Sequence, residues 1–109
     1  MPQGESRGEP ALDPVIHPIP RLRICALLAP VTEEEFSTLR ELMQTTDSAL
    51  SKQLATLADA GYVGQRRAAR GGRSRVWVAL TDSGRRAFRR HLQALNALAD
   101  SPQEGSHRP

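Results

Sequence analysis

The chain has 109 residues, a length that suits one domain with a single modest core. Its net charge is +3. Its single cysteine excludes an internal disulfide framework, and no apolar run approaches the roughly 20 residues that a membrane span needs. No basic stretch followed by an apolar segment and a small-residue cleavage site opens the chain, so we expect a cytoplasmic protein.

Prolines dominate the start of the chain: five of the eight lie in residues 1–20, and each restricts its own φ and the residue before it. We expect a disordered tail over residues 1–11, a folded domain over 12–100 and a second tail over 101–109. The first helix is expected in the sequence RLRICALLA and should end at Pro30. Its small and apolar residues share one face: Leu22, Cys25, Ala26 and Ala29, with Leu28 beside it.

The sequence VTEEEFSTLRELMQ predicts a second helix, because its apolar residues recur at helical spacing. They are Phe36, Leu39, Leu42 and Met43. Residues 33–35 are all glutamate and lie near the helix start, where the helix dipole favours acids. Val31 and Thr32 could form a short extended stub before the helix.

The third helix has the clearest signals, with Thr46 as N-cap, Asp47 in the first turn and Gly61 as the stop. A leucine stripe recurs at i, i+4 and i+7 and should face inward: Leu50, Leu54 and Leu57. At about 100° per residue, the opposite face is small and polar. It consists of Ser48, Ser51, Lys52 and Ala55, with Thr56 nearer the flank.

After Gly61 the period of the sequence changes from helical to two. The stretch RRAARGGRSR, residues 66–75, holds five arginines and two glycines. Tyr62-Val63 and Val76-Trp77-Val78 flank it as β-formers, so we predict a β-hairpin that turns at Gly71-Gly72. These strands disfavour a disordered basic tail. A phosphate-binding loop is disfavoured because no helix follows the glycines.

Thr81 is expected to cap a last helix over about residues 82–100. Its apolar stripe, in residues 88–99, runs past the point where a small core should end. The lead-in, which is the segment from Leu12 to the start of the first helix, also has apolar residues that must be buried. We therefore expect these segments of two chains to pack about a two-fold axis in an isologous dimer. The expected interface comprises Val15, Ile16, Ile19, Phe88, Leu92, Leu95, Leu98 and Ala99.

The charge is unevenly distributed along the chain. Residues 46–90 carry nine arginines and one lysine against three aspartates, a net charge of +7, whereas residues 1–45 carry −3 and residues 91–109 carry −1. A polyanionic partner would therefore meet the middle third. Five hairpin arginines without compensating acids would repel one another unless an anion offsets them, which disfavours a merely solvated hairpin.

The order helix, stub, helix, short turn, helix, hairpin, helix is that of a winged helix-turn-helix, an α+β and mainly α fold. The stretch from Pro20 to about Ala99 resembles the winged-helix DNA-binding domains of MarR- and ArsR-type regulators, most of all the small stand-alone ones. The resemblance rests on L-x-x-L-x-x-A-G-Y-V at the end of the third helix, the arginine-rich wing, a strand ending in L-T and a helix opening D-x-G-R. It implies a three-helix core, a basic β-hairpin wing and a C-terminal dimerisation helix.

The resemblance implies that the recognition helix, residues 46–60, lies in the major groove of duplex DNA, and that the wing, residues 66–75, lies in the minor groove or on the backbone. The residues it assigns to DNA are Thr46, Asp47, Ser48, Ala49, Ser51, Lys52, Gln53, Arg66, Arg67, Arg70, Arg73 and Arg75. Lys52 can reach a guanine edge or a phosphate. Arg70 and Arg73 flank the tip and suit a narrow minor groove, whereas the other three arginines, on the strands, suit phosphates.

No metal, cofactor or catalytic arrangement is indicated. Cys25 lies on an apolar helix face without a Cys-x-x-Cys partner, which favours a buried structural thiol. No ligand spacing links His17, His91 and His107. Because no Ser/His/Asp or paired-carboxylate arrangement shares a face, we do not expect an enzyme.

We therefore expect a homodimeric, nucleoid-associated transcription factor that binds double-stranded DNA sequence-specifically and represses by blocking a promoter. The alternatives are a protein-interaction module on a winged-helix scaffold and a non-specific architectural DNA-binding protein. No residue pattern indicates a small-molecule effector, and nothing in the sequence points to a membrane as partner.

Overall fold

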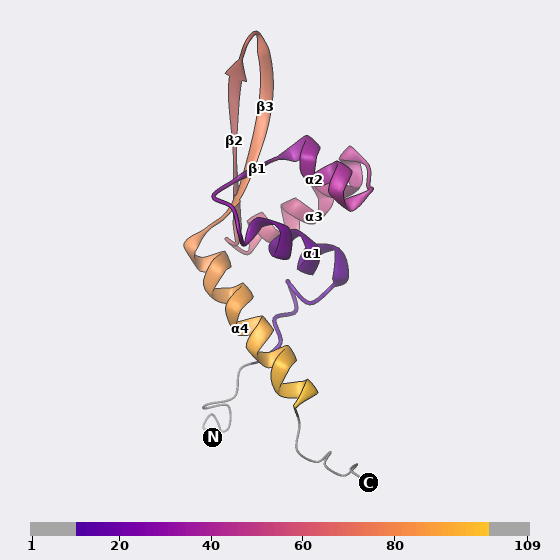
Figure 1. Cartoon of the computed structure of the whole chain (residues 1–109), viewed down its shortest axis with the longest axis vertical. Coiled ribbons are helices and arrows are strands. Elements are labelled where there is room, and N and C mark those ends of the chain that lie inside the picture. Colours follow the sequence, from indigo (N-terminus) through magenta and orange to yellow (C-terminus); the bar gives the residue numbers. More distant parts are fainter. Residues whose placement is uncertain (1–10, 101–109) are drawn as a thin grey trace.

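The computed structural model describes residues 11–100, and along them it has four helices and three strands in the predicted order (Figure 1). The elements are α1 (Ile19–Leu28), β1 (Glu34–Glu35), α2 (Phe36–Met43), α3 (Asp47–Asp59), β2 (Val63–Arg70), β3 (Arg73–Leu80) and α4 (Asp82–Ala99). The predicted α+β, mainly α architecture is therefore confirmed. Apart from Ala11, the two predicted tails lie outside the described residues.

The leucine stripe of α3 is part of the core. Leu50, Leu54 and Leu57 are at most 1% exposed, as their spacing predicts. Buried residues from the other helices and from both hairpin strands join them in one cluster: Ile24, Cys25, Leu28, Leu39, Val63, Val78, Leu80, Ala87 and Phe88. Removing apolar surface from water contributes about 25 cal/mol per Å², so this burial fixes which face of α3 turns outward.

The buried face of α1 differs from the predicted one. Ile24, Cys25 and Leu28 are fully buried, whereas Ala26 is exposed. Ile24 lies one helical turn from Leu28 and removes more apolar surface from water than an alanine does, so the helix turns that side inward. The helix ends shortly before Pro30, as predicted.

Two expectations for the second helix and its approach are wrong. Leu42 is 51% exposed, because the two turns of α2 present mainly the face around Leu39 to the core. The extended stub is formed by Glu34 and Glu35 rather than by residues 31–32, and it adds a third strand in the sheet order β1-β3-β2. Pairing with β3 satisfies backbone N–H and C=O groups there. The glutamates therefore precede the first turn of α2 instead of forming it.

The lead-in packs onto its own chain. Ile16, predicted at the dimer interface, is 0% exposed and belongs to the core, which corrects that assignment. The Asp13 carboxylate accepts hydrogen bonds from the N–H groups of Val15 and Ile16, and this turn carries Ile16 into the core. Val15 is half-buried, and Ile19 remains 64% exposed.

Burial explains the lone thiol. Cys25 is a free, fully buried cysteine, and desolvation raises its pKa to about 12, so the reactive thiolate is disfavoured. Within residues 11–100 no three His, Cys, Asp or Glu side chains gather where they could hold a metal ion. Over the same residues, none of the helices has the length and apolar character to span a bilayer.

Gly84→Ala should be strongly destabilising, because α4 begins in direct contact with the backbone before β2. A Cβ at Gly84 would lie 2.1 Å from the carbonyl oxygen of Tyr62, which is main chain and cannot move aside cheaply. We expect urea denaturation to show a loss of about 3 kcal/mol in the free energy of unfolding. In the control Gly64→Ala the new Cβ meets nothing within 4 Å, and the change should stay below about 1 kcal/mol. Equal stability of the two variants would contradict this close packing.

Candidate nucleic-acid interface

The outer face of α3 is exposed and carries no bulky side chain. Ser48, Ser51, Lys52 and Ala55 are all exposed, on the side opposite the leucine stripe. Thr56 at the flank is half-buried, and its hydroxyl donates to the Lys52 carbonyl at 3.4 Å. Such a face allows close approach to a partner, and its hydroxyl and ammonium groups can donate to base edges or phosphates.

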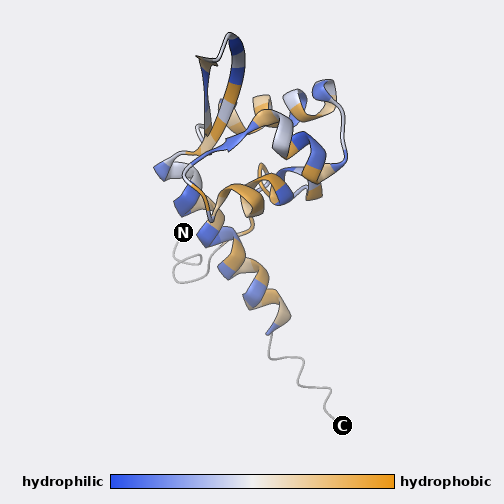
Figure 2. Ribbon diagram, turned by 45° about the horizontal axis from the view of Figure 1, so that its top comes forward, coloured by the Kyte–Doolittle hydropathy of each residue, from blue (hydrophilic) through white to orange (hydrophobic). Residues whose placement is uncertain are grey.

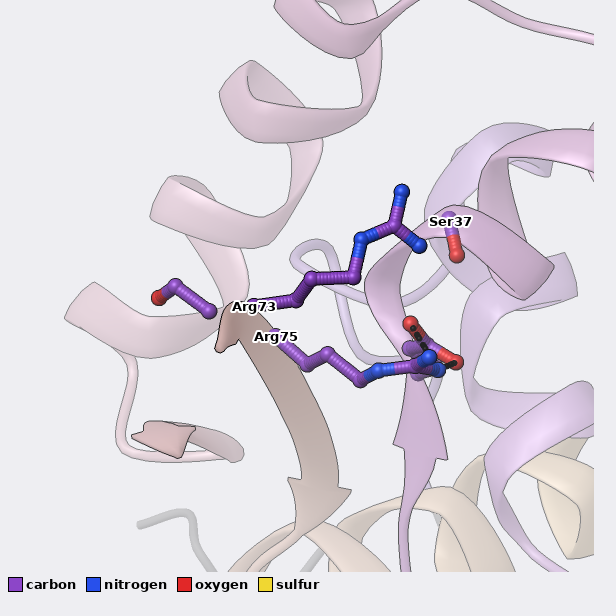
Figure 3. A pocket seen from close by; sticks show the side chains of 5 residues that line it. Ser37, Arg73 and Arg75 are labelled. Carbon is purple, nitrogen blue, oxygen red and sulfur yellow. Dashed lines mark hydrogen bonds and ion pairs between the residues drawn. The ribbon is translucent and has the colours of Figure 1, made fainter. Parts of the chain in front are cut away.

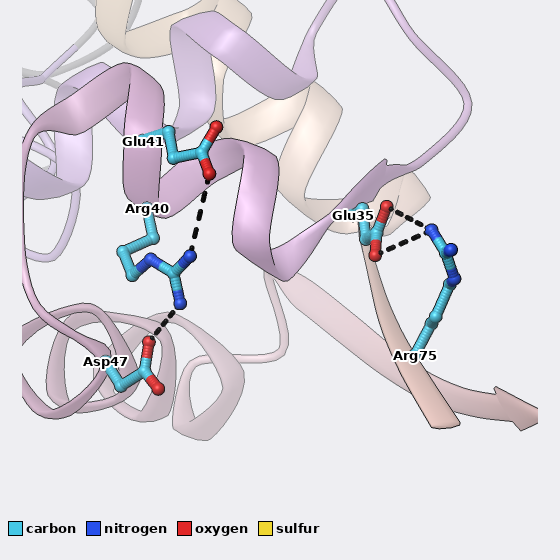
Figure 4. A network of polar contacts seen from close by, with 5 residues as sticks. All are labelled: Glu35, Arg40, Glu41, Asp47 and Arg75. Carbon is cyan, nitrogen blue, oxygen red and sulfur yellow. Dashed lines mark hydrogen bonds and ion pairs between the residues drawn. The ribbon is translucent and has the colours of Figure 1, made fainter. Parts of the chain in front are cut away.

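Arg40 ties the first turn of α3 to α2 (Figure 4). Its Nη1 donates to the Asp47 carboxylate at 2.7 Å, and its Nη2 lies 3.7 Å from the Glu41 carboxylate. The hydrogen bond to Asp47 raises the pKa of Arg40. Exposed pairs of this kind are screened by water and add little stability, so the contact orients α3 more than it stabilises it. Asp47, predicted at the DNA, has its carboxylate engaged within the chain.

Gln53 is turned towards α1. It is half-buried, and its Oε1 accepts a hydrogen bond from Arg21 Nη1 at 2.8 Å. Arg21 Nε donates in turn to the Val15 carbonyl at 2.6 Å, so one guanidinium group joins the lead-in to α3. Thr46 and Ala49 are exposed at the start of the helix. A DNA contact by Gln53 would compete with its bond to Arg21.

β2 and β3 pair over their full length and project from the helical body (Figure 1). Gly71 and Gly72 join them with φ values of 58° and 78°, which fit a two-residue type I′ turn. The predicted wing is therefore present. Alternation along β3 puts Arg73, Arg75 and Trp77 on one face of the sheet, and the residues between them lie on the face that leads into the core.

Two wing arginines are paired with glutamates at β1. Arg66 Nε donates to Glu33 Oε1 at 3.0 Å, and the guanidinium group lies 5.6 Å from the centroid of the Trp77 ring. This hydrogen bond lowers the pKa of Glu33 and raises the pKa of Arg66. Arg75 Nη1 donates to both carboxylate oxygens of Glu35 at 3.1 Å (Figure 4).

These pairs correct the expectation that no acid compensates the wing arginines. Glu33 and Glu35 reach the wing because β1 pairs with β3, a contact between distant parts of the sequence. Arg67 and Arg73 are exposed, and among the described residues neither forms an ion pair with a carboxylate. Arg70 lies opposite Arg73 in the strand register, next to the turn.

A cleft of about 370 Å³ lies between β3 and the start of α2 (Figure 3). It is lined by Glu35, Ser37, Arg73, Ser74 and Arg75. The guanidinium group of Arg73 extends towards Ser37 (Figure 3), and the Nε of Arg75 is buried without a hydrogen-bond partner. Two guanidinium groups and two hydroxyls around one carboxylate can accommodate an anionic group. No local pattern in the sequence indicates Ser37, because only the tertiary structure brings α2 beside the wing.

Arg85, near the start of α4, has a structural partner. Its Nη1 and Nη2 donate to the carbonyls of Ala29 and Val31, each at 2.8 Å. These carbonyls follow the C-terminus of α1, where intrahelical donors have run out, so the guanidinium group caps that end. Three further arginines of α4 are exposed: Arg86, Arg89 and Arg90.

The C-terminal half of α4 leaves the body of the molecule (Figures 1 and 2). Phe88 is buried, but Leu92 is 39% and Leu98 61% exposed, and Leu95 is half-buried. A hollow of about 250 Å³ beside the helix is lined by Ala29, Leu80, Arg85, Phe88, Arg89 and Leu92. The helix thus carries apolar side chains beyond the core, as its long stripe predicts.

The chain matches a known protein family. A family model described as a winged helix DNA-binding domain matches residues 20–99. The chain is 28% identical over 85 residues to the uncharacterized protein MJ0432 of Methanocaldococcus jannaschii. The aligned region covers 78% of this chain and 92% of that protein.

Solved structures share the fold. A transcriptional regulator homologue from Pyrococcus horikoshii OT3 has a TM-score of 0.75 at 27% identity, over 79% of this chain and 85% of the other. FabT from Streptococcus pneumoniae, solved in complex with DNA, has a TM-score of 0.61 at 21% identity, over 80% of this chain and 60% of the other. The FabT likeness is one of fold alone.

Thr46→Ala should weaken the start of α3. The Thr46 Oγ1 accepts a hydrogen bond from the Ala49 N–H at 3.1 Å, and an alanine leaves that donor unpaired. We expect the free energy of unfolding in urea to fall by about 1 kcal/mol. Thr56→Ala is the matched control, because its hydroxyl bonds only a carbonyl of its own helix and should matter by less than about 0.5 kcal/mol. A loss at Thr56 as large as at Thr46 would rule out a specific capping role.

Proposed function

Because the chain belongs to the family of winged helix DNA-binding domains, we propose that it is a transcriptional regulator that binds duplex DNA as a homodimer. In this proposal α3 enters the major groove, and the β2–β3 wing lies in the minor groove or on the backbone. The bound dimer represses by occupying a promoter. The observation that carries the proposal is the exposed, small and polar face of α3 on the same body as an arginine-rich wing.

In the major groove, Lys52 is the principal contact. Its ammonium group reaches a guanine edge or a phosphate, and the hydroxyls of Ser48 and Ser51 bond either. None of the three is a bidentate base reader, so sequence discrimination by α3 is moderate. Asp47 and Gln53 act mainly by orientation, since their side chains are bonded within the chain.

On the wing, the arginines have different roles. Arg70 and Arg73 flank the tip and probe the minor groove, where a narrow groove attracts guanidinium groups. Arg67 is exposed without an acidic partner among the described residues and contacts a phosphate. Arg66 and Arg75 contribute less to affinity, because a phosphate must displace the glutamates that already hold them. The Ser37 cleft offers a further phosphate contact beside Arg73.

The dimer forms through α4 and the start of α1. The exposed and half-buried apolar residues available for it are Val15, Ile19, Leu92, Leu95, Leu98 and Ala99. Phe88 contributes at the edge, and Ile16 supports the interface from the core. A two-fold axis here sets two copies of α3 about 34 Å apart, one turn of DNA, on a palindromic site.

This role requires no catalysis, metal or cofactor, and it locates the protein with the nucleoid in the cytoplasm. The DNA complex of FabT, which shares the fold, supports a DNA partner. The hollow beside α4 is the place where a small-molecule effector could act.

Fluorescence anisotropy should separate the proposed function from its alternatives. The labelled probes are the DNA upstream of the protein's own gene and a random duplex of the same length, at about 150 mM salt. We expect the upstream site to bind about a thousandfold tighter. Equal affinity for both would instead select an architectural DNA-binding protein. No detectable binding at about 50 mM salt would select a protein-interaction module.

Arg67→Ala should weaken binding to every duplex. Loss of one phosphate contact lowers the slope of log affinity against log salt by about 0.9. Arg66→Ala is the matched variant on the neighbouring position and should change the slope less, because Glu33 already neutralises Arg66. Glu33→Gln frees Arg66 and should tighten binding. The assignment fails if Arg66→Ala costs more than Arg67→Ala.

Leu98→Asp should convert the dimer to a monomer in size-exclusion chromatography with light scattering at micromolar concentration. A carboxylate buried in an apolar helix–helix contact loses its hydration, and no partner there offsets the cost in free energy. Leu42→Asp is the control, because Leu42 is similarly exposed but lies on α2, and it should leave the dimer intact. A monomeric wild-type chain would exclude the homodimer.

A further inference from the structure

A polar cluster joins the lead-in to α4. His91 is a polar side chain of α4 with 0% exposure, and its Nδ1 accepts a hydrogen bond from the Asp13 N–H at 2.9 Å. Its Nε2 lies 3.4 Å from His17 Nδ1, with the two ring centroids 5.3 Å apart. The sequence showed no link between these histidines, because 74 positions separate them.

The hydrogen bonds assign the protons. His91 Nδ1 accepts from a backbone N–H and therefore carries no proton, so the proton of the neutral ring is on Nε2. That N–H donates to His17 Nδ1, which must also be unprotonated. A proton added to His91 Nδ1 would turn it into a donor that faces the Asp13 N–H, so this hydrogen bond would be lost. A proton added to His17 Nδ1 would likewise face the Nε2–H of His91, and two donors cannot bond to each other. Both bonds therefore coexist only when both rings are neutral.

We propose that Asp13, His17 and His91 form a protonation-sensitive joint, which holds the lead-in on α4 at neutral pH and releases it in mild acid. Release would uncover Ile16, which is fully buried under the lead-in turn. It would also remove the Val15 carbonyl that anchors Arg21, whose other bond is to Gln53 of α3. The joint thereby couples α4 to the recognition helix.

The charged and titratable groups around the joint come from each neighbouring element. The Asp13 carboxylate accepts a hydrogen bond from the Tyr62 hydroxyl at 2.7 Å, which raises the pKa of Tyr62. From α1, Cys25 feels the charge of Asp13, and from α4, Arg90 acts on Tyr62. The Asp13 charge favours a proton on His91, but burial and the neighbouring His17 oppose it and lower the pKa of His91.

The direction of the pH effect follows from that balance. A histidine whose pKa is lower in the folded state binds its proton more readily in the unfolded or released state. The joint therefore stabilises the docked lead-in above the ordinary histidine pKa of about 6.5, and this stabilisation is lost as the pH falls below it.

Amide hydrogen exchange and histidine NMR on the full chain test the joint directly. Between about pH 7.5 and pH 5.5, we expect the protection of the Asp13 and Ile16 amides, corrected for intrinsic rates, to fall several-fold relative to that of Leu54, with about tenfold as the limit for one histidine. Titration of the His91 ring over this range with unchanged protection of Asp13 would overturn the proposal.

His91→Gln is the informative variant, because its Oε1 can accept from the Asp13 N–H and takes up no proton. We expect the pH dependence of the Asp13 protection to disappear. Persistence of the full pH dependence would overturn the joint. If this variant does not fold, the wild-type exchange and ring titration decide alone. His107→Gln, in the C-terminal tail, is the control and should behave as wild type.

The consequence for α3 rests on the proposed DNA-binding function. DNA affinity of the wild type should fall more between about pH 7.5 and pH 5.5 than that of His91→Gln, in proportion to the fraction of chains whose lead-in is released. Absence of DNA binding at both pH values would refute the proposed function and leave the exchange result standing. Equal pH dependence in both proteins, with the lead-in released, would refute the coupling to α3.

Discussion

The burial of one leucine stripe constrains most of this molecule. Leu50, Leu54 and Leu57 are removed from water within a cluster that draws on every helix and on the hairpin. When one face of a helix is buried in the core, helical geometry fixes which residues lie on the opposite, outer face. The small polar face of α3 is therefore outside by geometry, and it moves only together with the hairpin and helices that hold the stripe. A helix and a wing held on one core in a fixed relation suit the recognition of a regular duplex.

Ion pairs at the shortest strand of the sheet reduce the repulsion among the wing arginines. Five arginines on a two-stranded ribbon repel one another, and the pairing of β1 with β3 brings Glu35 and the preceding Glu33 to two of them, Arg75 and Arg66. The remaining positive charge stands at Arg67 and around the tip. Affinity for a polyanion then depends less on how many arginines the wing holds than on which of them remain uncompensated.

The last helix serves two purposes along its length. Around Phe88 and His91 it completes the core and receives the lead-in, and from Leu92 onward it carries exposed apolar side chains, which the proposed dimer would bury. Because the lead-in also contacts α3 through Arg21, events at the proposed dimer helix and at the recognition helix share one short chain of contacts. In the proposed joint, the lead-in is therefore the link between the two helices.

The sequence by itself determined the order of elements, the buried stripe of α3, the threonine caps and the Gly71-Gly72 turn. These rest on periodicity, capping and backbone preference, which act within a few residues. Only the tertiary structure decided that Ile24 rather than Ala26 faces the core, that the glutamates pair with the wing, and that two distant histidines meet. Such choices depend on which elements come together in space, and a local pattern carries no information about that.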